Sequence, residues 1–185
     1  MPPREPKILL ALAGAFLAIS AIRCHDLFTW FLEVLPILLG APLLIATHRR
    51  FPLTPLAYRL VFIHALILMV GGHYTYAEVP FGFSLKDAFH LARNPYDRIG
   101  HFAQGFVPAI LAREVLLRKT PLKRGGWLFF LVTSICLAIS AAYELFEWGT
   151  AEATGQAAEA FLGTQGDPWD TQWDMFTALV GALSA

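Results

Sequence analysis

The chain has 185 residues, of which 56% are hydrophobic and only 15% are charged. Soluble domains carry about 25% charged residues, so this composition excludes an ordinary soluble protein and predicts one embedded in a lipid bilayer. The 14 basic residues balance the 14 acidic ones, and no net field points to nucleic acid as a partner.

Apolar segments long enough to form membrane helices recur along the chain. A transmembrane helix needs about 20 mostly apolar residues, and strand-like alternation is absent, which leaves helices as the spanning element. The recurrence rules out a single signal peptide ahead of a secreted domain. We therefore expect an all-α, polytopic transmembrane helix bundle that forms a single integral membrane domain over residues 1–185. About six spans are predicted, at residues 8–22, 27–46, 60–76, 97–117, 126–148 and 171–185.

Two longer connections join the predicted spans, and the first of them is too polar to span. In residues 78–96, Ser84 followed by Asp87 resembles a helix-capping pattern. The Gly- and Ala-rich connection over residues 149–170 is expected to contain a short interfacial helix. The last span, 171–185, is shorter than usual, so either it is tilted into the protein or the chain ends early.

The distribution of basic residues predicts the orientation. Cytoplasmic connections of membrane proteins are enriched in Lys and Arg, and residues 148–172 contain neither. This asymmetry favours an N-in, C-in topology. The basic residues then assigned to the cytoplasmic side are Arg4, Lys7, Arg49, Arg50, Arg59, Arg118, Lys119, Lys123 and Arg124.

Ionisable residues gather near the predicted outer ends of four spans, where a carboxylate in an apolar segment is costly and usually functional. The basic residues alone set the topology, yet all of these ionisable residues fall on the outer side. They are His73, Asp97, His101, Glu144, Glu147, Asp167, Asp170 and Asp174.

Helical spacing pairs most of these residues on single faces. Residues three or four apart are neighbours on a helix, which describes Asp97 with His101, Glu144 with Glu147, and Asp170 with Asp174. Metal sites in helix bundles are built from such carboxylate and histidine pairs on facing helices. Other interpretations stay open. The aspartates at helix starts would be favoured by the helix macrodipole alone, and the histidine at 73 would be satisfied by a backbone carbonyl.

Three motifs resemble a known family. The segments NPYDRIGHFAQGF (94–106), YELFEW (143–148) and GTQGDPWDTQWDM (163–175) are similar, in this order, to the YjdF-like family of uncharacterised bacterial inner-membrane proteins. The resemblance covers most of the chain and implies a multi-pass protein of the bacterial inner membrane with a shared polar centre. The topology predicted from the basic residues places this site at the periplasmic side or cell exterior.

A more distant resemblance is to VanZ-like membrane proteins. Those have Asp-x-x-x-His at the start of one span, a glutamate in a later span and an aspartate near the start of the last. Where the distant family commonly has Glu-x-x-Gln, this chain has Glu144-x-x-Glu147. Association of that family with glycopeptide resistance suggests the cell envelope, by analogy.

The predicted cofactor is a divalent metal ion. Carboxylate oxygens suit Mg²⁺, Mn²⁺ or Ca²⁺, and histidines admit Zn²⁺ or Mn²⁺. We expect a metal-dependent hydrolase or transferase acting on a lipid-linked or envelope substrate, with the lipid bilayer as its surroundings. The predicted metal ligands are His101, Glu144, Glu147, Asp170 and Asp174. The predicted catalytic residues are Asp97, His101 and Glu147, and the predicted substrate-binding residues are Arg98, His73 and Asp167.

Two other functions use the same residues. In a cation- or proton-coupled transporter, or an ion-binding membrane protein without enzymatic activity, the acids would form the ion site. Their position at one face argues against transport, because transporter sites usually lie near the midplane. A structural role as interhelical glue is the third possibility. Interhelical hydrogen bonds contribute about 0.6 kcal/mol each on average. Eight ionisable groups are therefore more than helix packing alone would require.

Overall fold

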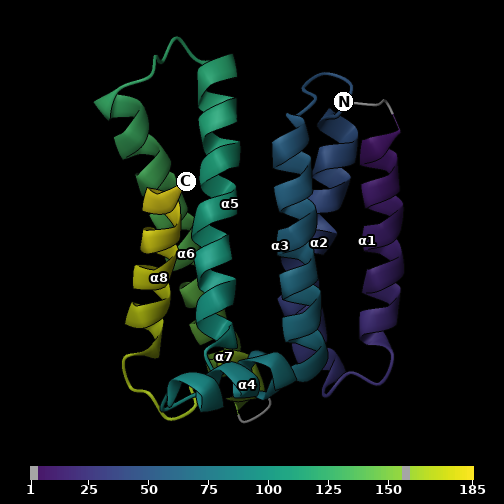
Figure 1. Ribbon diagram of the computed structural model, residues 1–185, viewed down its shortest axis with the longest axis vertical. Coiled ribbons are helices and arrows are strands. Elements are labelled where there is room, and N and C mark those ends of the chain that lie inside the picture. Colours follow the sequence, from purple (N-terminus) through teal and green to yellow (C-terminus); the bar gives the residue numbers. More distant parts are fainter. Residues whose placement is uncertain (1–3, 156–158) are drawn as a thin grey trace. The chain divides into compact units, whose positions relative to one another are not determined.

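A computed structural model describes residues 4–155 and 159–185, and every regular element in these ranges is helical. The predicted all-α class is thus confirmed. The chain divides into two compact units, the first ending at Asn94 and the second beginning at Pro95 (Figure 1). The elements are α1 (Glu5–Ala21), α2 (Leu27–Thr47), α3 (Pro55–Tyr74), the 3-10 turn η1 (Tyr76–Glu78), α4 (Pro80–Phe89), α5 (Tyr96–Lys119), α6 (Gly126–Thr154), α7 (Glu159–Leu162) and α8 (Asp170–Ser184).

In the first unit, α3 packs against both α1 and α2 (Figure 1). Val34 and Met69 are buried at this contact. Side chains cap the starts of α2 and α3. At α2, Asp26 accepts a hydrogen bond from the Thr29 N–H at 2.6 Å, which holds the pKa of that carboxyl below its ordinary value. Thr54 caps α3, so this helix begins at Pro55, five residues before the predicted start.

The predicted helix start at Ser84 is wrong. The helix α4 begins at Pro80, whose fixed φ suits a first turn. Ser84 therefore lies inside the helix, where its hydroxyl donates to the Pro80 carbonyl at 3.3 Å. The polar spacing of Ser84 and Asp87 was a less useful signal than the proline that precedes them.

The second unit is built from α5, α6 and α8, which contact one another (Figure 1). Its apolar core includes Ala109, Leu128, Val132, Cys136 and Ala182. Both Cys24 and Cys136 are free thiols. The helix α6 continues to Thr154, six residues past the predicted end, and stops before Gly155, which has a φ of 63°.

Two glycines let α5 and α8 approach each other closely. A Cβ at Gly105 would overlap the Ala178 carbonyl, and a Cβ at Gly181 would overlap the Phe102 carbonyl. Small residues at such positions allow the backbones of membrane helices to come together. Each glycine thus fixes the separation of the two helices that carry most of the predicted site.

Replacing Gly181 with valine is expected to lower the thermal stability of the detergent-solubilised protein. The added methyl groups must push α8 away from the Phe102 carbonyl, and overpacking of this kind costs about 1–3 kcal/mol. Gly149→Val is the matched control, because nothing lies within 4 Å of a Cβ at that position. Equal unfolding temperatures for the two variants would contradict the close approach.

Within residues 4–155 and 159–185, three helices, α2, α3 and α6, are long and apolar enough to cross a membrane. With 17 and 15 residues, α1 and α8 are shorter than a usual span, which takes about 20 residues, and α5 carries charged residues near both ends. Six spans, their orientation and a single domain over the whole chain remain predictions.

Candidate metal centre

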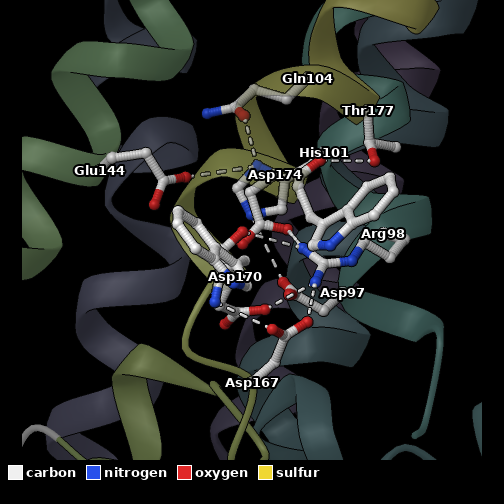
Figure 2. Close-up of polar contacts among 11 residues, drawn as sticks. Asp97, Arg98, His101, Gln104, Glu144, Asp167, Asp170, Asp174 and Thr177 are labelled. Atoms are coloured by element: carbon white, nitrogen blue, oxygen red, sulfur yellow. Dashed lines mark hydrogen bonds and ion pairs between the residues drawn. The ribbon is translucent and has the colours of Figure 1, made fainter. Parts of the chain in front are cut away.

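The candidate centre lies in the second unit, where the starts of α5 and α8 meet the later half of α6. Asp97 and His101 lie one turn apart on α5, and Asp170 and Asp174 lie one turn apart on α8 (Figure 2). Glu144 projects toward them from α6. These five side chains, from Asp97, His101, Glu144, Asp170 and Asp174, belong to buried residues that are 3–8% exposed. The sequence-predicted pairs on α5 and α8 therefore face one another.

Arg98 joins α5 to α8. Its Nη2 lies 2.8 Å from Asp170 Oδ1, and its Nη1 donates both to the Asp174 carboxylate and, at 3.2 Å, to the Asp170 carbonyl. Asp167, in the loop before α8, lies 3.5 Å from Nη2. A guanidinium has five donors in a planar fork, which suits several carboxylates at once. To bind an anionic substrate, as predicted, Arg98 would have to release these carboxylates.

The His101 ring presents different nitrogens to different partners. Its Nδ1 lies 2.9 Å from the Gln104 amide oxygen, which only accepts, so Nδ1 carries the hydrogen. Its Nε2 lies 3.4 Å from Asp97 Oδ1 and 3.6 Å from Asp174 Oδ1 (Figure 2). In the neutral ring, Nε2 then directs its lone pair toward two carboxylate oxygens.

Glu144 stands on the opposite side of that ring. Its Oε1 lies 3.8 Å from His101 Nδ1 and has no hydrogen-bond partner among the described residues, although the side chain is buried. Ser140, one turn earlier on α6, is fully buried and its hydroxyl is likewise without a hydrogen bond in the described part of the chain. Buried polar atoms without partners are uncommon, and each calls for an explanation.

The geometry of Asp97, His101 and Asp174 suits a metal ion. Each offers one ligand atom, and the three atoms lie within 4.8 Å of one another. Around a metal with ligands at about 2.1 Å, neighbouring ligand atoms of a tetrahedron are about 3.4 Å apart, close to the 3.4 and 3.6 Å found from His101 Nε2. The Nδ1–H bond to Gln104 is the kind of contact that orients a metal-binding histidine.

Charge favours a cation at the same place. The four carboxyl groups of the cluster outnumber its two basic groups, the Arg98 guanidinium and the His101 imidazole, and belong to Asp97, Asp170, Asp174 and Glu144. Uncompensated charges inside a bundle are costly, so the cluster attracts a positive ion. The buried group of Asp97, His101 and Asp174 can therefore bind a metal ion.

Not all predicted site residues belong to this group. His73 lies in the first unit, where its Nδ1 contacts the Ser20 carbonyl at 2.9 Å, which agrees with the alternative of a backbone-bonded histidine. Glu147 is buried on α6, one turn after Glu144. The three-residue metal group does not include Glu144, Glu147 or Asp170, and their roles as ligands remain predictions.

Gln104 is the residue that sequence reasoning missed. It follows His101 by three positions, so the two side chains share a face of α5. The spacing of three residues is visible in the sequence. An uncharged amide in an apolar segment is, however, a weaker indicator of a functional site than a carboxylate.

Comparison with known proteins agrees with the sequence motifs. Residues 6–185 match the family described as "Predicted membrane protein (DUF2238)". The Escherichia coli K12 protein named "Inner membrane protein YjdF" is 57% identical over 165 residues, which cover 89% of this chain and 79% of that protein. No solved structure matches. The match over nearly the whole chain shows that this protein belongs to the DUF2238 family of predicted membrane proteins.

Proposed function

We propose that the protein is a multi-pass inner-membrane hydrolase or transferase that uses one divalent metal ion to act on a lipid-linked or envelope substrate. The observation that carries the proposal is the convergence of Asp97, His101 and Asp174, buried and within 4.8 Å of one another through their ligand atoms. The name of the E. coli relative supports the inner membrane as the location.

Each side chain has a distinct task in this proposal. Asp97, His101 and Asp174 hold the ion. Arg98 fixes the Asp174 carboxylate and keeps α8 against α5, as its contacts with Asp170 and Asp174 support. Gln104 fixes the His101 tautomer so that Nε2 stays available to the metal.

The carboxylates of α6 supply acid–base chemistry. A bound divalent ion lowers the pKa of a water ligand and neutralises charge that develops on a phosphoryl or acyl group. Glu144 and Glu147 lie on one face of α6, and Glu144 Oε1 has no hydrogen-bond partner in the described ranges. Glu144 or Glu147 accepts the proton of the attacking water and returns it to the leaving group.

The proposed orientation places this site at the periplasmic side. Six spans with cytoplasmic termini put the basic 118–124 connection inside and the 149–169 connection, which has no Lys or Arg, outside. The two helices that carry Asp97 and Asp170 both begin at these residues or one before, so the site lies near one end of the bundle and not at its midplane.

Cysteine accessibility tests this orientation. In a background lacking Cys24 and Cys136, single cysteines at Leu122 and Gly155 are labelled in intact cells with a membrane-impermeant maleimide. We expect labelling at 155 from outside, and at 122 only after the membrane is permeabilised. Labelling at 122 in intact cells would overturn the proposed topology.

A reconstituted assay tests the reaction. Liposomes made from bacterial envelope lipids, containing the purified chain and Mn²⁺, are analysed by mass spectrometry for cleaved or transferred lipid head groups. We expect turnover by the wild type, loss of at least 100-fold in the double variant Glu144→Gln/Glu147→Gln, and retained metal binding in that variant, because both glutamates lie outside the three-residue metal group.

The control is Glu114→Gln, a buried glutamate on α5 that pairs with Arg118 and lies away from the cluster. This variant is expected to turn over lipid at the wild-type rate. If metal-loaded liposomes showed no lipid product but released trapped cations in a manner abolished by Asp174→Asn, the protein would be a transporter and the enzyme proposal would be wrong.

A further inference from the structure

A second feature of the α5–α6–α8 unit is a groove away from the metal centre, along the later turns of α5 and the end of α8. Its volume is about 240 Å³. One wall is formed by the small and apolar side chains of Ala109, Leu128, Val132 and Ala182. The groove is thus lined by three helices and is mostly apolar.

Two arginines stand in the lining of this apolar groove. Arg113 comes from α5, and Arg124 from the connection just before α6. Glu114, the acid beside Arg113 in the sequence, is paired with Arg118. Among the residues that the structure describes, neither Arg113 nor Arg124 forms an ion pair. Two arginines that form no ion pair among the described residues therefore line one mostly apolar groove.

The first turn of α6 places this end of the groove at a membrane surface. Trp127 is 75% exposed, and Phe129 and Phe130 are more than half exposed. Tryptophan is enriched at the level of lipid head groups. Arg124, three residues before Trp127, would then lie among the head groups, while the groove wall on α6 continues toward the hydrocarbon.

We infer that this groove binds an anionic phospholipid. Arg113 and Arg124 hold the head-group phosphate, since a guanidinium donates two parallel hydrogen bonds to phosphate oxygens. One acyl chain lies along Ala109, Val132 and Ala182. Basic pockets between membrane helices on the cytoplasmic side bind anionic head groups in this manner. The inference rests on the membrane placement proposed above but not on the metal site or its chemistry.

Native mass spectrometry of the full chain, released from nanodiscs of mixed phosphatidylglycerol and phosphatidylcholine, tests the inference. We expect one phosphatidylglycerol to remain bound to the wild type in preference to phosphatidylcholine. The double variant Arg113→Gln/Arg124→Gln is expected to bind it roughly thirtyfold more weakly. Thr133→Trp, which fills the groove from α6 and leaves both arginines in place, is expected to weaken binding as well.

Arg49→Gln/Arg50→Gln is the matched control, because it removes the same charge from the same predicted membrane side and lies outside the groove. Wild-type retention in this control, with loss in the groove variants, supports the site. Equal loss in both double variants would show general surface attraction, and the inference would fail. It would also fail if millimolar inorganic phosphate displaced the lipid, or if phosphatidylcholine were retained equally. Lipid turnover and metal binding are unaffected by either result, so failure here is distinct from failure of the enzyme proposal.

Discussion

Replacing Arg98 with methionine is expected to lower the free energy of unfolding by about 3–5 kcal/mol. The Arg98 side chain is 19% exposed, and its guanidinium contacts the carboxylates of Asp170 and Asp174, whose side chains are 6% and 4% exposed. Methionine preserves most of the side-chain volume, so the loss comes from leaving two buried carboxylates without their cation. Removing one partner of a buried ion pair has this large effect because the other charge stays desolvated.

Unfolding in a denaturing detergent, followed by helical circular dichroism, measures this loss. Arg59→Met is the control, because Arg59 is 59% exposed and pairs with Glu5 at the surface, where an ion pair contributes little. A second variant, Arg98→Met with Asp170→Asn, removes one of the stranded charges and is expected to recover part of the loss. If Arg98→Met were as stable as Arg59→Met, Arg98 would not hold α5 to α8.

The second large effect concerns the metal ion. His101→Gln and Asp174→Asn are each expected to weaken divalent-metal binding by more than about 100-fold, because even partners that only orient the ligands contribute 10–100-fold. At a metal concentration of about 100 times its dissociation constant, the wild type gains about 2.7 kcal/mol of stability. The variants gain almost none at the same concentration.

Isothermal titration with Mn²⁺ or Zn²⁺, combined with thermal unfolding, measures both quantities. Glu114→Gln serves again as the control, since it removes a buried carboxylate from α5 outside the metal group. A chelator should lower the unfolding temperature of the wild type and of this control, and leave the His101 and Asp174 variants unchanged. Equal metal-induced stabilisation in all four proteins would rule out the three-residue site.

The sequence predicted the locations of the helices more accurately than the residues at which they begin and end. Apolar length located α2 and α6 correctly at their first residues, Leu27 and Gly126. Pro36, Pro42 and Pro108 all lie inside continuous helices, as the predicted spans required. Misplaced ends arose at local features that hydropathy ignores, such as the Pro80 start of α4.

The sequence predicted which site residues share a face of one helix. It did not predict which residues of α5 contact those of α8. Helical periodicity alone placed Asp97 with His101, and Asp170 with Asp174. The ion pairs of Arg98 with Asp170 and Asp174 depend on how closely α5 and α8 approach, which Gly105 and Gly181 determine through contacts across 70 or more residues. No spacing rule along one helix contains that information. His73 was predicted to belong to the site from its position alone. In the first unit its Nδ1 instead contacts the Ser20 backbone carbonyl.

Binding of one divalent cation by Asp97, His101 and Asp174 is tested most directly by pulsed electron paramagnetic resonance. With Mn²⁺ bound to the purified chain, the ¹⁴N of a coordinating imidazole modulates the echo. We predict ¹⁴N modulation from one histidine in the wild type and in His73→Gln, and its disappearance in His101→Gln. Bound Mn²⁺ without nitrogen modulation, or modulation that persists in His101→Gln, would contradict binding at this site.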